Sequence, residues 1–262
     1  MNPEEFKPHV SIGLTSGRFS LSTIHTKSEL LLAQKLRYLV FQNELIGHAS
    51  ENGIDQDEFD EVADHLAIYD TKSGVMVATC RLNCSLYSEK YYATQEFDCA
   101  ELLVTDAVKL ELGRVCVHAE YRKGAVLMLI WRGIADYMKK TQTEILFGCG
   151  SIMTESPEDA VMIYKYLSEQ KKVNTTGKIL PTKPYQHPEF EKIWNADQRL
   201  LSFEETNKAK ELLPALCRSY FDMGCVVSGP PAFDREFKCI DFLTVLELKN
   251  LDPVIRQKII GS

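Results

Sequence analysis

The chain has 262 residues, which is enough for one large domain or two small ones with a full hydrophobic core, and we favour one enlarged domain. Its formal net charge of −7 argues against general binding of nucleic acid. The longest apolar stretch, Ala125 to Trp131, falls far short of the roughly 20 residues that cross a bilayer. The amino terminus also lacks the basic and apolar regions of a secretory signal, so we expect a cytoplasmic protein.

The eight cysteines lie mostly inside apolar runs and form no Cys-x-x-Cys pair. This pattern favours reduced, buried thiols over a disulfide framework or a zinc site. Calcium binding by the acidic segment is also disfavoured. An EF-hand loop beginning at Asp55 would need Gly and Glu where the chain has Asp60 and Leu66. We therefore expect no metal site.

Residues 1–20 show no hydrophobic periodicity and are expected to form a loosely ordered arm. A helix then begins at Thr26, because Thr26 and Glu29 have the spacing of a capping box. Its predicted core stripe consists of Leu32, Leu36, Leu39 and Val40. A second stripe on the same helix, at i, i+4 and i+7, consists of Arg37, Phe41 and Glu44.

The segment from Glu51 to Asp64 is strongly acidic and is expected to form a loop. Such an acidic rim would attract a cationic amino acid, and a plain solvated loop fits the composition equally well. Two strands of a hairpin are predicted next, at residues 63–69 and 75–82, joined by a polar turn that ends in Gly74. Residues 83–108 follow as an irregular excursion with a short helix or turn near residues 100–104.

A buried strand at residues 109–118 carries two charged side chains, Glu111 and Arg114. Buried charge is costly unless it is paired or used, so this strand is a candidate functional site. The apolar alternation changes parity at Gly113, which indicates a β-bulge. A bulge there would point Glu111 and Arg114 into the same cleft.

The second half of the chain contains further alternating helices and strands. We predict helices at residues 123–141, from 156 and at 214–223, strands at 144–149, 225–228 and 237–246, and an inserted loop at about 171–203. The order is that of an α/β protein with a mixed sheet, in which residues 21–262 form a single domain.

Several short motifs, taken in chain order, resemble the ornithine-lipid type N-acyltransferases. The motifs are Arg37-x-x-x-Phe41, Asp55-x-Asp57-x-Phe59-Asp60, Asp64-His65-Leu66, Arg81-Leu82, Glu111-Leu112-Gly113-Arg114 and Tyr121-Arg122. The resemblance continues through Leu146-Phe147-Gly148-Cys149 and Phe237-x-x-Ile240-Asp241-Phe242 and covers roughly residues 30–247. This family belongs to the GNAT superfamily and is related to the acyl-homoserine-lactone synthases.

The resemblance implies a GNAT-like fold, with a mixed, mostly antiparallel central sheet flanked by helices and a C-terminal extension. It also implies transfer of a fatty acyl group, often 3-hydroxylated, to the α-amine of an amino acid, usually ornithine, giving lyso-ornithine lipid. The expected donor is the 4'-phosphopantetheine arm of acyl carrier protein, with no tightly bound cofactor. A lipid product further implies peripheral contact with a membrane.

The chemistry needs a base, because an α-ammonium group cannot attack a thioester until it loses a proton. Glu111 is the candidate base, with Arg114 as a second catalytic residue. The predicted acceptor-binding residues are Arg37, Phe41, Asp57, Asp60, Asp64, His65 and Arg81. The predicted acyl-donor-binding residues are Val115, Cys116, Val117, Arg122, Lys123 and Gly124.

Structural roles compete with these assignments. Glu111 and Arg114 would also fit a simple buried ion pair. Arg37 either binds the acceptor carboxylate or pins the acidic loop to the first helix. Asp64 and His65 orient either the acceptor or Arg81, and a lone histidine on a strand is more often a hydrogen-bonded core residue.

The donor loop departs from the pattern of GNAT enzymes that use acetyl-coenzyme A. Their Arg/Gln-x-x-Gly-x-Gly/Ala loop holds a pyrophosphate at a helix amino end, whereas residues 122–125 here read Arg-Lys-Gly-Ala. The departure favours a carrier-protein arm, which has a phosphate but no pyrophosphate. Basic residues between positions 121 and 140 either form a solvated helix face or meet the acidic carrier protein.

Three other functions remain as alternatives. The nearest is an acyl-homoserine-lactone or other N-acyl amino acid synthase, and a second is an acetyl-coenzyme A acetyltransferase. The third is a non-catalytic GNAT-like module that binds carrier protein, against which the presence of Glu111 and Arg114 argues.

Overall fold

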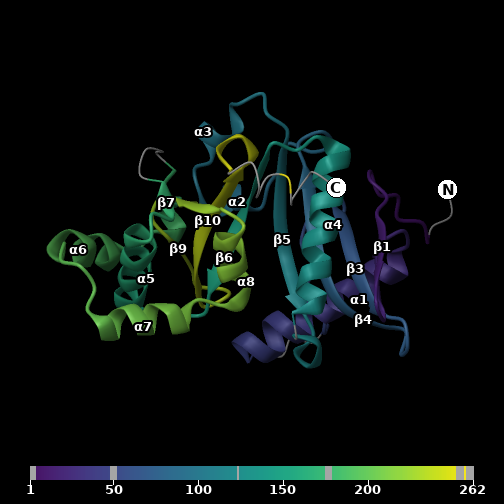
Figure 1. Ribbon diagram of the computed structural model, residues 1–262, viewed down its shortest axis with the longest axis horizontal. Helices are drawn as coiled ribbons and strands as arrows, with labels where there is room; N and C mark the ends of the chain where they lie inside the picture. Colours follow the sequence, from purple (N-terminus) through teal and green to yellow (C-terminus); the bar gives the residue numbers. More distant parts are fainter. Residues whose placement is uncertain (1–3, 48–51, 123, 175–178, 252–256, 258–262) are drawn as a thin grey trace. The chain divides into compact units, whose positions relative to one another are not determined.

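The computed structural model describes residues 4–47, 52–122, 124–174, 179–251 and 257. The contacts divide the chain into two compact units (Figure 1). Among the described residues, the first unit comprises those within 4–91 and 107–146, and the second comprises those within 92–106 and 147–251. The single domain expected over residues 21–262 stays a prediction.

The first unit is built on five antiparallel strands in the order β1-β2-β3-β4-β5. These strands are β1 Gly13–Ser16, β2 Phe19–Thr23, β3 Asp64–Asp70, β4 Val75–Cys84 and β5 Lys109–Val117. Its helical elements are α1 Lys27–Arg37, the π-helix η1 Tyr38–Ile46, the 3₁₀ turn η2 Ala119–Tyr121 and α4 Ala125–Thr141. Figure 1 shows α4 in front of the strands and α1 behind them.

The two faces of this sheet differ in what covers them. On the α4 face, a Cβ added to Gly133 would lie 2.6 Å from Cδ1 of Leu21 in β2, so a larger residue there would displace the Leu21 side chain. On the α1 face, Leu36 and Val40 pack in one apolar cluster with Ala67 of β3. Because side chains alternate along a strand, neighbouring residues of β3 and β4 point to opposite helices.

Two sequence expectations for the first unit need correction. Part of the expected arm forms the hairpin β1–β2, which pairs with β3 through β2. Leu32 and Leu39 of the expected core stripe are exposed, at 47% and 40%. The buried face of α1 instead includes the polar residues Gln34 and Arg37, because the acidic loop packs on it. The capping box of Thr26 and Glu29 is confirmed.

The second unit contains β6 Ile145–Ile152, whose first two residues belong to the first unit. Its strands follow the order β6-β10-β8-β7, with β9 paired to β10. The remaining strands are β7 Val173–Asn174, β8 Val226–Ser228, β9 Ala232–Asp234 and β10 Cys239–Glu247. The β7–β8 pair is parallel, while β8 and β9 lie antiparallel to β10, so the predicted mixed sheet is confirmed.

Short helices surround the strands of this unit. They are α2 Ala93–Glu96, α3 Ala100–Leu103, α5 Pro157–Glu169, η3 Lys183–Tyr185, α6 Pro188–Ala196, α7 Phe203–Leu212, α8 Ala215–Asp222 and η4 Leu248–Asn250. The segment expected to be an inserted loop, residues 171–203, therefore contains a helix. In the described part of the chain, none of the helices combines the length and the apolarity needed to cross a bilayer.

A glycine turn in the second unit gives the first testable prediction. Gly229 has a φ of +83°, and a Cβ there would lie 1.9 Å from the carbonyl oxygen of Ile179. Gly229→Ala is therefore expected to lower the free energy of unfolding by more than the roughly 1–2 kcal/mol of left-handed strain alone. The matched control is Gly74→Ala, at a φ of +72° with no atom within 4 Å. Equal losses in urea unfolding would contradict the steric argument.

Candidate active site

A cluster of three arginines and three aspartates lies on the α1 face of the first unit. The arginines come from three elements, namely Arg37 from α1, Arg81 from β4 and Arg114 from β5, and the aspartates are Asp55, Asp57 and Asp60 of the acidic loop. The six formal charges sum to zero, which is the condition under which buried ionic groups are tolerated. We call this group the Arg–Asp cluster.

Arg37 is the most deeply buried member of the Arg–Asp cluster, with 1% of its side chain exposed. Its Nε donates to Asp55 Oδ1 at 2.7 Å, and its Nη1 donates to Asp60 Oδ1 at 2.7 Å. The neighbouring Gln34 adds a bond from Nε2 to Asp60 Oδ2 at 3.0 Å. Arg37 thus pins the acidic loop to α1, which is one of the two roles that its sequence position left open.

The other two arginines bind the same loop from the sheet. Arg81 Nη1 donates to Asp60 Oδ1 at 2.9 Å and also to Asp57. Arg114 Nη2 donates to Asp57 Oδ2 at 2.9 Å, and its Nε lies 3.4 Å from Asp55 Oδ1. Every aspartate of the cluster therefore contacts two arginines, so the loop is held at three points.

Asp60 is the centre of this network. Burial opposes its ionisation, but the guanidinium groups of Arg37 and Arg81 outweigh burial and hold the pKa of Asp60 well below its usual range. A lowered folded-state pKa means that the stabilisation is present above the unfolded value of about 4 and is lost as the pH falls below it. The loop is thus expected to be sensitive to acid.

His65 lies under the same loop and is nearly fully buried. Its Nε2 lies 3.0 Å from the backbone oxygen of Asp60, so Nε2 carries the proton in this bond. Burial lowers the pKa of His65 to about 4, and the nearby guanidinium groups of Arg37 and Arg81 also disfavour its charged form. His65 is therefore neutral at pH 7 and orients the loop.

The lowered pKa of His65 gives a prediction for pH titration. Between the unfolded value of 6.5 and the folded value of about 4, only the unfolded chain binds the proton. The free energy of unfolding should therefore fall as the pH drops through this window. NMR titration of the ring should give a midpoint near 4, and a midpoint near 6.5 would show that the ring is not held neutral by burial.

Asp64 faces the opposite side of the sheet from His65. Its Oδ1 and Oδ2 accept hydrogen bonds from the backbone nitrogens of His9 and Val10, at 2.8 and 2.9 Å, and Tyr137 of α4 donates to Oδ2 at 2.8 Å. The structure thus separates Asp64 from the Arg–Asp cluster. Asp64 fixes the amino-terminal segment instead.

The predicted β-bulge is present on β5. Arg81 pairs with Gly113 and Thr79 pairs with Cys116, so two residues, Arg114 and Val115, lie opposite one residue of β4. Arg114 itself adopts the left-handed conformation, with a φ of 51°. The bulge directs the Arg114 side chain to the acidic loop, where its partners include Asp55 and Asp57.

Glu111 lies on the same strand, two residues before Gly113, and is 4% exposed. Its register partner is Asn83, which follows Arg81 by two residues on β4. Glu111, Asn83, Gly113 and Arg81 therefore share one face of the sheet. Burial raises the pKa of Tyr91 to about 12, and the negative charge of Glu111 contributes to this rise. The register places a buried carboxylate on the face that carries the Arg–Asp cluster.

The expected donor-binding residues follow the bulge. Cys116 belongs to the apolar cluster of Leu36, Val40 and Ala67, and Phe41 packs against this cluster. Burial raises the pKa of the Cys116 thiol to about 12. Arg122 is paired with Glu44 through both terminal nitrogens. Gly124, at a φ of +84°, is the residue before α4 and makes no side-chain cap. Lys123 lies outside the described residues.

Sequence reasoning quoted Asp55 in a motif but did not count it among the site residues. In the structure, Asp55 pairs with two arginines, Arg37 and Arg114, as Asp57 and Asp60 each pair with two. The spacing of the three aspartates was the available signal. Asn83, the cross-strand neighbour of Glu111, had no sequence signal of its own.

Comparison with known proteins gives a consistent result. The model of the acetyltransferase (GNAT) domain family matches residues 36–132. This range includes every residue of the Arg–Asp cluster and also Glu111. The L-ornithine N(α)-acyltransferase of Rhizobium meliloti (strain 1021) is 30% identical over 240 residues, covering 86% of this chain and 78% of the relative. That of Rhodobacter capsulatus is 27% identical over 241 residues, covering 87% and 90%.

A solved N-acyl amino acid synthase from uncultured soil microbes is 9% identical, with coverage of 90% of this chain and 94% of its own and a TM-score of 0.49. The family match and the α/β architecture with its bulged strand define a GNAT-type acyltransferase. Within that class, the chain belongs to the L-ornithine N(α)-acyltransferase family. The expected family and fold class are therefore confirmed.

Proposed function

We propose that this enzyme transfers a fatty acyl group, often 3-hydroxylated, from acyl carrier protein to the α-amine of ornithine, giving lyso-ornithine lipid. The acceptor is suggested by the names of the relatives, which are L-ornithine N(α)-acyltransferases. The observation that carries the proposal is the buried carboxylate of Glu111 on the bulged strand, next to an ionic cluster of balanced charge.

In the proposed mechanism, Glu111 removes a proton from the α-ammonium group, directly or through one water. The free amine then attacks the thioester carbonyl, and backbone N–H groups of the bulged strand stabilise the charge that develops on its oxygen. The new C–N bond forms as the C–S bond breaks. The second proton of the attacking nitrogen leaves with the phosphopantetheine thiol, and Glu111 releases the first proton to solvent. No cysteine nucleophile is needed, and the raised pKa of Cys116 keeps that thiol protonated.

The accessible edge of the Arg–Asp cluster is the proposed acceptor site. Arg114 and Asp57 have 14% and 19% of their side chains exposed, whereas Arg37 and Asp60 have 1% and 2%. Arg114 would bind the acceptor carboxylate, and Asp57 would bind its side-chain ammonium. The buried Arg37 and Asp60 then act as positioning residues, together with Arg81, His65 and Phe41.

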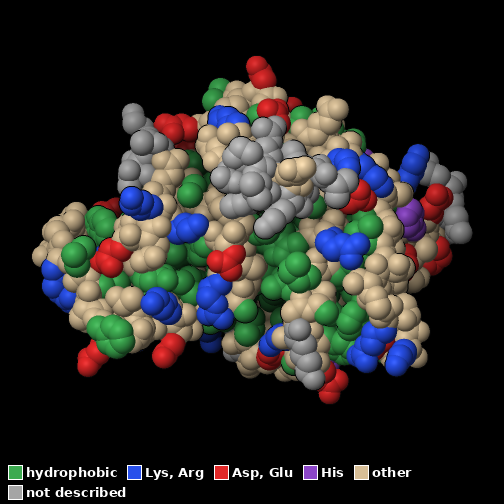
Figure 2. Space-filling model, viewed as in Figure 1, with side chains coloured by type: hydrophobic (Ala, Val, Ile, Leu, Met, Phe, Trp, Pro, Cys, Tyr) green, Lys and Arg blue, Asp and Glu red, His purple; other side chains and the backbone are tan. Residues whose placement is uncertain are grey.

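The phosphate of the donor arm would bind at the amino end of α4. The first backbone N–H groups of a helix lack intrahelical partners, and Gly124 supplies no capping side chain there. Arg122 borders this helix end, with its charge balanced by Glu44. Figure 2 shows Lys and Arg side chains interspersed with acidic ones on the face that carries α4, so carrier-protein docking would rest on local contacts.

Mass spectrometry of the products tests this proposal. The protein is mixed with either 3-hydroxyacyl carrier protein or the matching acyl-coenzyme A, and with ornithine, lysine, glycine or glutamine in turn. We expect N-acyl ornithine to form fastest with the carrier-protein donor. Faster transfer from acyl-coenzyme A would overturn the donor, and faster acylation of another amino acid would overturn the acceptor.

A further inference from the structure

Three buried carboxylates meet in the second unit, in residues that the proposed reaction does not use. They are Glu96 at the end of α2, Asp234 at the end of β9 and Asp241 in β10, and all three are buried. One side-chain oxygen from each lies within 4.8 Å of the others. Asp241 pairs with Ala232, so Asp234, two residues further along β9, lies on the same face of the hairpin. We call this group the carboxylate triad.

The members of the carboxylate triad differ in their hydrogen bonds. Asp234 Oδ1 accepts from the backbone nitrogens of Glu236 and Phe237, at 2.8 and 3.0 Å. Asp241 accepts from Ser151 Oγ at 2.6 Å. Glu96 is fully buried, and neither of its carboxylate oxygens accepts a well-formed hydrogen bond, although Tyr92 and Cys149 lie close enough to favour its charged form. A buried carboxylate without a well-formed hydrogen bond is costly, so Glu96 needs either a proton or a ligand.

The three carboxylates crowd one another, because one oxygen of each lies within 4.8 Å of the others. Burial raises the pKa of Glu96 well above its usual range, and the carboxylates of Asp241 and Asp234 raise it further. The same three carboxylates also face Tyr185, whose pKa is raised to about 12, mainly by burial. This concentration of negative charge creates a local field that a cation would relieve.

We propose that the carboxylate triad binds a hard divalent cation, with Glu96, Asp234 and Asp241 each supplying one oxygen ligand. Ca²⁺ takes oxygen ligands at about 2.3–2.6 Å, so ligands on opposite sides of the ion lie up to about 5 Å apart, which accommodates the observed spacing. Mg²⁺ needs shorter bonds and usually keeps several waters, which suits a buried site less well. Ca²⁺ is therefore the preferred ion, ahead of Mn²⁺ and Mg²⁺.

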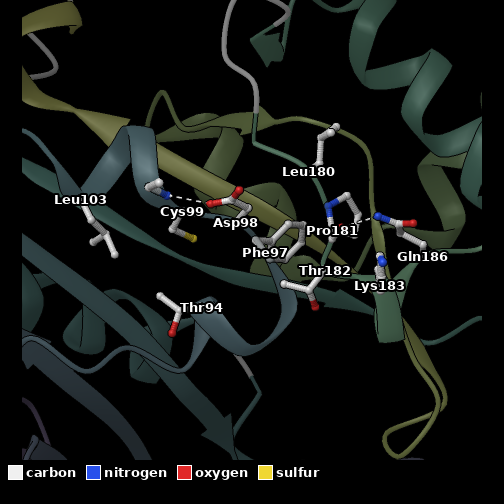
Figure 3. Close-up of a pocket in the computed structure, with 11 residues that line it drawn as sticks. Thr94, Phe97, Asp98, Cys99, Leu103, Leu180, Pro181, Thr182, Lys183 and Gln186 are labelled. Carbon is white, nitrogen blue, oxygen red and sulfur yellow. Dashed lines mark hydrogen bonds between the residues drawn. The ribbon is translucent and has the colours of Figure 1, made fainter.

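Of the triad, only Asp241 stands in a motif quoted from the sequence, and positions 96, 234 and 241 have no metal-binding spacing. Its position suggests what the ion would do. The backbone nitrogen of Thr182 donates to the oxygen of Glu96 at 2.7 Å, and that of Asp98 donates to the oxygen of Leu180 at 2.9 Å. These bonds join the two walls of a pocket of about 540 Å³, shown in Figure 3. A bound cation would fix α2 to the β9–β10 hairpin and thereby hold one wall of this pocket.

Cation binding by the whole protein tests the proposal. Protein treated with EDTA is titrated with Ca²⁺, Mn²⁺ and Mg²⁺ by calorimetry, and with Tb³⁺ by luminescence sensitised through the nearby Tyr185. We expect one saturable Ca²⁺ site and a rise in Tm that grows with the Ca²⁺ concentration. Glu96→Gln should weaken binding about tenfold or more, because a charged ligand is lost. Glu211→Gln, at an exposed position of α7, should bind as the original protein does.

Two outcomes would overturn the cation site. One is the absence of saturable binding of all four ions to the original protein, combined with metal-free protein by elemental analysis before EDTA treatment. The other is binding that persists unchanged in both Glu96→Gln and Asp241→Asn. If Glu96→Gln fails to fold, the stoichiometry of Tb³⁺ bound to the original protein decides, since one ion per chain supports the site and none contradicts it.

Discussion

Replacing Glu111 with glutamine is expected to lower the turnover number about 10²-fold or more while the fold stays intact. The amide has the shape of the carboxylate but cannot accept the proton of the α-ammonium group, so the general-base contribution is lost. The residue is buried on β5 and faces Asn83, and a neutral side chain there should not unfold the sheet. Turnover is measured with saturating donor and acceptor, alongside the Tm.

The matched control is Glu204→Gln, which removes an exposed carboxylate from the first turn of α7. Its turnover should equal that of the original protein. The pH dependence separates a base from a merely structural carboxylate. The residual rate of Glu111→Gln should rise with pH as the free amine becomes more abundant. Turnover near that of the original protein would contradict the role of Glu111.

Replacing Arg37 with methionine is expected to lower the free energy of unfolding by about 3–5 kcal/mol, the usual result of removing one partner of a buried ion pair. The change leaves Asp55 and Asp60 buried with fewer donors, because Arg37 donates to both at 2.7 Å. Methionine retains much of the apolar volume, so the loss reports the missing guanidinium group. Urea unfolding of purified protein measures it.

Arg132→Met is the control, because Arg132 is an exposed arginine on α4, and a change within about 0.5 kcal/mol is expected there. The same pair of variants separates the two roles of Arg37. If Arg37 pins the loop, stability falls first, and activity follows the folded fraction. Unchanged stability with a raised KM for the acceptor would show that Arg37 binds substrate instead.

Local signals in the sequence predicted local structure well. The capping box at Thr26 and Glu29 needs only the backbone that carries it, and the structure reproduces both of its bonds. The hairpin of β3 and β4 turns at Gly74, whose φ of +72° suits glycine. The parity change around Gly113 located the bulge within one residue, although Arg114 takes the positive φ.

The hydrophobic periodicity of the first helix predicted its buried face wrongly, because ion pairs with a distant loop bury a charged residue. The expected stripe placed Leu32 and Leu39 in the core, whereas both are exposed and Arg37 is buried. The carboxylates of the loop offset the cost of burying the arginine side chain. Hydrophobic spacing within the helix carries no information about these carboxylates. Beyond Arg37 the helix continues as a π-helix, so positions counted at α-helical spacing, such as Glu44, drift from their expected face.

The candidate site was predicted in part for the same reason. Arg81, Asp57 and Asp60 stood in motifs, and the structure joins them in one network. Asp64 stood beside His65 in the same motif, yet strand alternation sends it to the other face, where it binds the amino-terminal segment. Which side of a sheet a motif residue serves depends on what covers each face, and this became visible only in the structure.

The central claim, acyl transfer to an α-amine, is tested most directly with ornithine labelled with ¹⁵N at the α position. The protein is mixed with equimolar 3-hydroxyacyl carrier protein and the labelled ornithine, and the product is analysed by tandem mass spectrometry. The account predicts a single acyl group on the labelled nitrogen, formed by the original protein and about 10²-fold more slowly by Glu111→Gln. Acylation of the unlabelled side-chain nitrogen, or an intact donor after prolonged incubation, would contradict it.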